Sequence, residues 1–278
     1  MPVLIILAVL ILAALLIDMI DLHRFVPRTY EFTGFKVARS TTFVQLSDLH
    51  NHVYGRDNET LLQAIDRVNP DFIVVTGDMV NGKKKEKFDS TLLFLKKLAQ
   101  NYAVYYEYGN HECRLEKKYP EDYLRFAKAL EQTGVTLLRN HNTFLPEYGI
   151  RLYGLELPKK FYLRGKPAPM NPEDLTGLMG TVDDSVCNVL LAHLPDYAKE
   201  YAGWGADLTL SGHIHGGLVR LPGLGGVVSP RVRFFPKYDG GEFTEMGRKM
   251  VVSRGLGFHS LPIRIFNPGE LVIITLKP

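Results

Sequence analysis

The hydrophobic pattern of the chain begins with one unbroken apolar run and continues as short apolar segments separated by polar ones. Residues 3–17 contain no polar side chain. With the residues on either side, the run reaches the roughly 20 residues that a membrane-spanning helix needs. We therefore expect a membrane anchor over residues 1–20. Residues 21–41 then form a connector and a first strand, because aromatic residues between positions 30 and 35 alternate with polar ones.

A cleaved signal peptide is the alternative interpretation of this run. No Lys or Arg precedes it and no small-residue cleavage motif follows it, which favours an uncleaved anchor. Asp18 and Asp21 lie nearest to the run, but acidic residues contribute little to membrane topology. Basic side chains follow the run, so the positive-inside rule favours a cytoplasmic position for the rest of the chain. These side chains are His23, Arg24, Arg28, Lys36 and Arg39.

The first half of the chain then alternates apolar runs with amphipathic segments. The runs at 42–46, 72–76 and 103–108 are rich in β-branched and aromatic residues, which predicts buried strands. Apolar residues at helical spacing predict a helix over 58–69 and another that starts near residue 89. One strand and one helix take about thirty residues, the size of a βαβ unit, so the three strands should be parallel.

A polar side chain follows each of these strands. Asp48 comes after the first, Asp78 after the second and Asn110 after the third. The carboxyl ends of parallel strands meet at one edge of a sheet, and ligands of open α/β sheets gather there. We therefore expect the three side chains to lie close together.

The second half of the chain repeats this arrangement less regularly. Apolar runs at 186–192 and 208–210 predict two more buried strands, followed by His193 and by the pair His213 and His215. The remaining predicted elements are strands at 150–155, 249–253 and 271–276 and a short helix at 195–201.

Composition adds little to this picture. The net charge is +3 over 278 residues, so charge alone indicates no nucleic-acid partner. Cys113 and Cys187 are too few for a disulfide framework and are not spaced as a zinc knuckle. The chemistry must therefore come from the polar residues at the strand ends.

Those residues belong to a series of short motifs that suits a pair of metal ions. Together the motifs supply two carboxylates, one amide oxygen and several imidazoles. Carboxylates neutralise and bridge cations, and imidazoles complete the shells of borderline metals such as Zn, Fe and Mn. The motifs are Asp48-Leu49-His50, Gly77-Asp78, Gly109-Asn110-His111-Glu112, His193 and Gly212-His213-Ile214-His215.

This series resembles that of the calcineurin-like metallophosphoesterases, and the resemblance extends over about residues 42–276. The hydrophobic N-terminus is similar to that of the bacterial membrane-anchored members. The resemblance implies an α/β fold in residues 42–278, namely a four-layer αββα sandwich with a dinuclear metal site at the sheet edge.

The resemblance also implies a role for each motif residue. Asp78 would bridge the two metal ions, and His111 would be catalytic without being a ligand. The expected metal ligands are Asp48, His50 and His215 for one ion and Asn110, His193 and His213 for the other.

The leading hypothesis is therefore a hydrolase that uses two divalent ions (Mn, Fe or Zn) to cleave phosphodiester or pyrophosphate bonds. The anchor and the basic and aromatic segment at 158–170 favour a lipid-linked substrate at the membrane, with Lys160 and Arg164 as candidate substrate-binding residues. One alternative is a phosphomonoesterase or phosphoprotein phosphatase, which the same metals permit. The other is a membrane adaptor that keeps the fold without catalysis.

Overall fold

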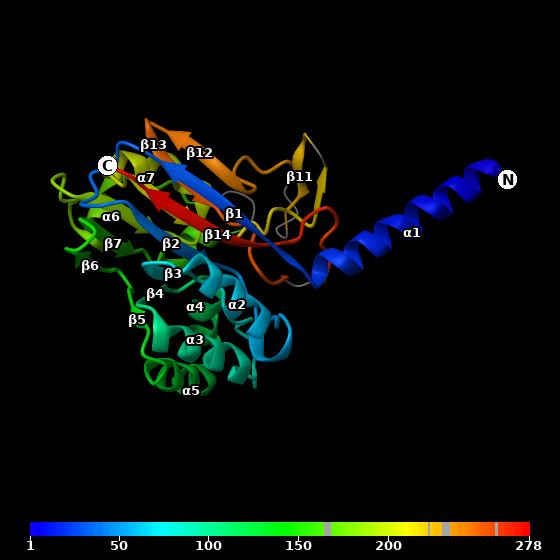
Figure 1. Ribbon diagram of the computed structural model, residues 1–278, viewed down its shortest axis with the longest axis horizontal. Helices are drawn as coiled ribbons and strands as arrows, with labels where there is room; N and C mark the ends of the chain where they lie inside the picture. Colours follow the sequence, from blue (N-terminus) through cyan, green and yellow to red (C-terminus); the bar gives the residue numbers. More distant parts are fainter. Residues whose placement is uncertain (164–167, 222, 230–233, 259–260) are drawn as a thin grey trace.

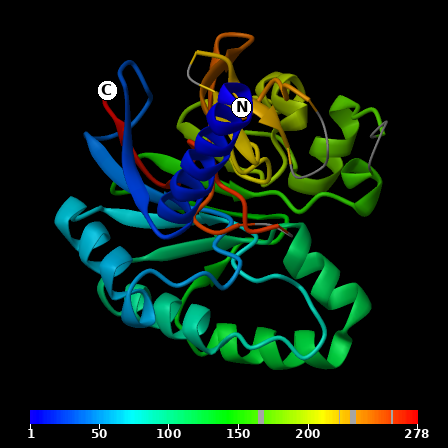
Figure 2. The ribbon, with the colours of Figure 1, turned by 90° about the vertical axis from the view of Figure 1, so that its right-hand side faces the viewer.

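Two sheets lie face to face in this protein, and helices cover the outer face of each. The computed structural model describes residues 1–163, 168–221, 223–229, 234–258 and 261–278. In Figure 1 the helices labelled α2 to α5 lie on the outer side of one sheet, and those labelled α6 and α7 lie on the outer side of the other. Figure 2 shows the same layers from one end. This is the predicted four-layer αββα arrangement.

The first sheet combines the N-terminal half of the chain with its last strand. Its strands, in spatial order, are β1 (Phe25–Phe32), β14 (Gly269–Leu276), β2 (Thr41–Leu46), β3 (Phe72–Thr76), β4 (Val104–Glu107) and β5 (Thr136–Leu137). From β2 to β5 the strands are parallel, as the βαβ spacing predicts. β14 is antiparallel to β2 and parallel to β1.

The second sheet is built from the other half of the chain. Its order is β12 (Gly241–Glu245), β13 (Arg248–Val252), β9 (Leu208–Ser211), β8 (Cys187–Leu191), β7 (Ile150–Gly154) and β6 (His141–Leu145). The four central strands are parallel, and the two edge strands are antiparallel to their neighbours. A separate hairpin joins β10 (Val219–Leu221) and β11 (Gly225–Val228).

The core has three apolar layers. The layer between the sheets includes Phe43 and Phe72, whose rings stack with centroids 4.8 Å apart. A second layer joins the first sheet to its helices through residues such as Leu61 and Phe94, and a third joins the second sheet to its helices through Tyr201. The helices are α2 (Glu59–Val68), α3 (Asp89–Asn101), α4 (Asn110–Lys118) and α5 (Pro120–Glu131) on the first side, and α6 (Pro172–Met179) and α7 (Ala198–Trp204) on the second.

Every strand that was expected to precede a site residue is present. β2, β3, β4, β8 and β9 end within one or two residues of the predicted positions. β1 begins earlier than the aromatic pattern suggested, at Phe25. α4, α6 and the edge strands β5, β6 and β12 were not predicted.

The N-terminal run forms α1 (Pro2–Leu22), a helix of 21 residues that projects from one end of the domain (Figure 1). Its length and composition are sufficient to cross a membrane. The last turn of α1 is part of the domain. Asp18 accepts a hydrogen bond from the backbone N–H of Arg264 at 2.6 Å, and buried Asp21 accepts one from the backbone N–H of Asn267 at 2.9 Å.

Candidate metal centre

The motif residues lie in sharp turns at the carboxyl ends of the strands. Asp48, His50, Asp78, His213 and His215 all have positive φ, between 49° and 72°. Asp and His are among the residues that adopt this left-handed region more often than others. The turns direct side chains from both sheets into one buried space.

Two motif glycines make room for the carboxylates. A Cβ atom at Gly109 would overlap Oδ1 of Asp78, and one at Gly212 would overlap Oδ2 of Asp48. The glycine in each motif is therefore a steric requirement of the neighbouring carboxylate.

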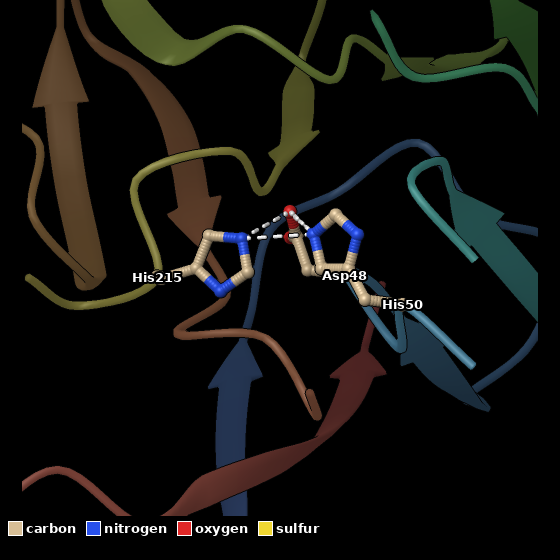
Figure 3. A group of neighbouring side chains, drawn as sticks. All are labelled: Asp48, His50 and His215. Atoms are coloured by element: carbon tan, nitrogen blue, oxygen red, sulfur yellow. Dashed lines mark hydrogen bonds and ion pairs between the residues drawn. The ribbon is translucent and has the colours of Figure 1, made fainter. Parts of the chain in front are cut away.

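The first group of potential ligands is Asp48, His50 and His215, whose ligand atoms all lie within 4.8 Å of one another. Nε2 of His215 is 3.1 Å from Oδ1 of Asp48 and 3.1 Å from Nε2 of His50. Figure 3 shows both imidazole rings turned toward the carboxylate. Two nitrogens on one zinc ion, at bond lengths of about 2.0–2.1 Å, lie roughly 3 Å apart, so the spacing fits a shared cation.

The second group is Asp78, His193 and His213. Nε2 of His193 is 3.1 Å from Oδ2 of Asp78 and 3.2 Å from Nδ1 of His213. Asp78 also belongs to a third group with His50 and His111, whose Nε2 atoms are 3.9 and 3.8 Å from its Oδ2. Asp78 thus lies between the histidines of these two groups.

Backbone carbonyls fix the orientation of three imidazoles. Nδ1 of His193 lies 2.7 Å from the carbonyl oxygen of Thr76, Nδ1 of His50 3.2 Å from that of Val80, and Nδ1 of His111 2.6 Å from that of Asn81. A carbonyl only accepts, so each Nδ1 carries a proton, and Nε2 is the ring atom directed at the site. Partners of this kind commonly orient metal-binding histidines.

The electrostatics of the site favour ionised carboxylates. Burial alone would raise the pKa of Asp48, but His215 beside it holds that pKa below its usual range. Burial would also raise the pKa of Asp78, and His111 and His193 instead lower it well below the ordinary value. Burial would lower the pKa of His193, yet Asp78 raises it to about 9. Two buried carboxylates that remain ionised require positive charge nearby.

Asn110 supplies a direct indication that a metal fits. Its Oδ1 atom is buried and has no hydrogen-bond partner among the residues that the structure describes. A buried carbonyl oxygen without a partner is costly unless another group binds it. With the two clusters of Asp and His beside it, this oxygen matches a further ligand for a divalent cation.

Comparison with known proteins agrees with this geometry. The model of the calcineurin-like phosphoesterase family matches residues 41–217, which include all of the motifs. The chain belongs to this family. It is therefore a metal-dependent phosphoesterase, a hydrolase of phosphate esters, as the motifs predicted.

The calcineurin-like relatives include bacterial and animal proteins. An uncharacterized metallophosphoesterase of Bacillus subtilis, YkuE, is 29% identical over 88% of this chain and 80% of its own length. One from Campylobacter jejuni is 30% identical over 87% of this chain and 60% of its own length. A zebrafish protein described as a transmembrane protein with a metallophosphoesterase domain is 29% identical over 84% of this chain, which spans about half of it.

From its place in the motif, Glu112 could orient the neighbouring His111 or line the turn, and the structure agrees with the second role. It does not orient His111 in this structure. Its carboxylate accepts hydrogen bonds from the backbone N–H groups of Asp78, Met79 and Gly109 at 2.8–3.0 Å and from the Tyr106 hydroxyl at 2.7 Å. Glu112 thereby ties the turn after β3 to the start of α4.

A cavity of about 320 Å³ adjoins Asn110 and was not anticipated from the sequence. Its wall combines cationic and apolar side chains. Lys117, Lys118 and Lys159 have no ion-pair partner among the described residues. The lining residues are Asn110, Cys113, Arg114, Lys117, Lys118, Leu157, Lys159, Tyr162 and Leu163.

The two candidate substrate-binding residues lie differently. Lys160 is exposed, forms an ion pair with Asp174 at 3.2 Å and does not line this cavity, whereas its neighbour Lys159 does. Arg164 lies outside the described residues. A signal for the α4 residues was available, because Arg114, Lys117 and Lys118 are spaced i, i+3 and i+4, which places them on one face of a helix.

The first prediction tests the role of Glu112. Glu112→Gln should lower the free energy of unfolding, because the new amide donates where backbone donors need an acceptor. A buried donor left without a partner costs about 1–3 kcal/mol. Exposed Glu121→Gln on α5 is the matched control and should change stability by less than about 0.5 kcal/mol. Equal unfolding midpoints in urea for both variants would contradict this role.

Proposed function

We propose that this phosphoesterase binds two divalent metal ions and cleaves phosphodiester or pyrophosphate bonds in a substrate held at a membrane. The observation that carries the proposal is that Asp78 belongs to one ligand group with His193 and His213 and to another with His50, which also belongs to the group of Asp48 and His215. One carboxylate between two cations reduces their mutual repulsion, which is the arrangement that paired metal sites require.

The ligand assignment follows from the two groups. Asp48, His50 and His215 would hold one ion, with Asp78 as the bridge. Asn110, His193 and His213 would hold the other. The mixture of carboxylate, amide and imidazole ligands suits Mn, Fe or Zn. When bound, such a pair activates water and neutralises charge on the phosphate oxygens.

In this proposal His111 moves a proton and does not hold metal. Its Nδ1 is fixed by the carbonyl of Asn81, and its Nε2 points toward Asp78 at 3.8 Å. Burial lowers the pKa of His111, Asp78 opposes this shift, and nearby Arg114 lowers the pKa further. In its protonated form the ring can donate a proton from Nε2 to a leaving oxygen.

The cavity beside Asn110 favours a diester or pyrophosphate over a simple monoester. A cavity of about 320 Å³ accommodates a large substituent on the scissile phosphate, such as the second group of a diester or of a pyrophosphate. Lys117 and Lys118 suit a second anionic group on that substituent. Leu157 and Leu163 suit an apolar part of it.

The N-terminal helix supports a substrate at the membrane. α1 is long and apolar enough to span a bilayer, and it leaves the domain without a flexible linker. A domain attached in this way meets lipid-linked phosphate esters at high local concentration. The basic residues His23, Arg24 and Arg28 after α1 favour the cytoplasmic side.

Three activities are distinguished by one comparison. A phosphodiesterase hydrolyses a small chromogenic diester faster than the corresponding monoester when manganese is added. A phosphomonoesterase or phosphoprotein phosphatase shows the opposite preference, and an adaptor hydrolyses neither.

The second prediction concerns metal content. The purified protein should bind two equivalents of manganese or iron, measured by inductively coupled plasma mass spectrometry. Asp78→Asn should reduce occupancy at both positions, because the bridging residue loses its charge. Asp66→Asn on α2, remote from the motifs, is the control and should keep both ions. Retention of two full equivalents by Asp78→Asn would rule out the bridging role.

The third prediction separates catalysis from metal binding at His111. His111→Ala should lower kcat by roughly 10²–10⁴-fold, the usual contribution of a general acid. Metal content should stay close to that of the unchanged protein. A variant that loses metal but keeps its activity per bound ion would instead make His111 a ligand.

The fourth prediction concerns the basic wall of the cavity. Charge reversal by Lys117→Glu together with Lys118→Glu should raise KM for a pyrophosphate-containing substrate more than for the small chromogenic diester. The reason is that only the former places a second anionic group near α4. Lys96→Glu, an exposed lysine on α3, is the control. Equal KM changes for both substrates would show that the wall does not select for the second charge.

A further inference from the structure

We propose that a rim of exposed apolar side chains around the base of α1 rests in the membrane interface and holds the metal centre close to the lipid head groups. The proposal depends on the membrane attachment described above. The side chains are between 41% and 68% exposed. The rim consists of Leu221, Leu224, Phe234, Phe235, Leu261 and Phe266.

The rim is a concentration of apolar surface rather than a chance scatter. Other exposed large apolar residues of the described part of the domain lie on separate elements, for example Leu124 on α5, Phe144 on β6 and Met246 between β12 and β13. Isolated residues of this kind are normal on a soluble surface, whereas a contiguous group marks a contact with a membrane or a partner. Three of the exposed phenylalanines belong to the rim, and aromatic side chains are favoured at the membrane interface.

Hydrogen bonds join the segments that carry the rim. The backbone N–H of Arg220 in β10 donates to the carbonyl of Ile265 at 3.0 Å, and the N–H of Ile265 donates to the carbonyl of Leu218 at 3.2 Å. On the other strand of the hairpin, the N–H of Phe235 donates to the carbonyl of Val227 at 2.9 Å. Backbone hydrogen bonds therefore join the hairpin to the segment at 234–235 and to the segment at 264–267.

The same surface is attached to α1. The segment 264–267 receives both carboxylates of the last turn of the helix, Asp18 and Asp21. Figure 1 shows β11 and the segment before β14 on the side of the domain from which α1 projects. The bilayer that takes up α1 is thus the surface nearest to the rim, which favours lipid over a protein partner as its occupant.

The scaffold of the rim also reaches the metal centre. Nδ2 of Asn267 donates to the carbonyls of His215 and Gly217 at 2.7 Å each. The guanidinium of Arg264 is buried and donates to the carbonyl of Gly257, whose N–H in turn donates to the carbonyl of Asp48 at 2.7 Å. One hydrogen bond from Asn267, or two in series through Arg264 and Gly257, therefore join the segment 264–267 to residues of the first ligand group.

This arrangement specifies where the substrate lies. With α1 in the bilayer and the rim in the interface, the metal centre is held beside the head-group layer. The class of substrate that this fits is a phosphate ester carried on a lipid, hydrolysed without leaving the membrane surface.

The test measures depth in a bilayer and does not require activity. The full-length protein, with Cys113→Ser, is reconstituted in vesicles of phosphatidylcholine and phosphatidylglycerol. A nitroxide label is attached at Leu224→Cys or Phe234→Cys, and at Phe144→Cys or Met246→Cys as exposed controls. Collision rates with oxygen and with a water-soluble nickel chelate report the environment of each label.

Labels on the rim should collide more with oxygen and less with the nickel chelate than the control labels do. Rim labels that are as accessible to the chelate as the controls would overturn the proposal. The depth measurement does not depend on catalytic activity. A protein whose rim labels are buried in the bilayer but which hydrolyses no phosphate ester would therefore contradict the proposed activity and agree with the proposed position of the rim.

A second measurement connects the rim to catalysis. The triple variant Leu224→Ser, Phe234→Ser and Phe235→Ser should hydrolyse a vesicle-embedded phosphodiester several-fold more slowly and a soluble chromogenic diester at an unchanged rate. Metal content and melting temperature verify its folding. The matched control changes Leu124, Phe144 and Met246 to Ser. Equal loss on both substrates, or no loss on either, would contradict the proposal.

Discussion

Two buried carboxylates, Asp48 and Asp78, set the conditions that the rest of the site satisfies. In the described residues neither forms an ion pair with Lys or Arg, and imidazoles and backbone N–H groups surround them instead. An ionised carboxylate away from water needs compensating positive charge. The motif glycines leave room for the two carboxylates, and the left-handed turns direct the neighbouring side chains toward them. Backbone carbonyls orient three of the histidines around the same space.

The sequence alone predicted the part of the fold that depends on local pattern. Runs such as 72–76 are continuous and β-branched, so the central strands and the residues after them were found. α4 was missed because it begins at a motif residue, Asn110, and carries mostly charged side chains. The edge strands β6 and β12 are largely polar, since only one side of an edge strand meets the core, and their pattern does not differ from that of a loop.

The sequence predicted that the motif residues gather at one place but did not predict what surrounds them. The order of the motifs predicted the groups around Asp48 and Asp78. Basic substrate-binding residues were expected at 158–170, but the basic side chains that line the cavity lie mainly on α4. Contacts such as Asp18 with Arg264 join residues 246 positions apart. No local pattern contains such a contact, because the partners become neighbours only after both sheets have formed.

The short passage from α1 to the first sheet has a consequence for proteolysis. Only His23 and Arg24 separate the helix from β1, and Asp21 before them is buried. Proteases cut backbone that is exposed and can become extended in their active sites. Between helix and sheet the chain offers almost no such stretch, so release of the domain from its helix would require β1 to detach from β14. The intact junction therefore resists cleavage between the helix and the domain for as long as the first sheet stays folded.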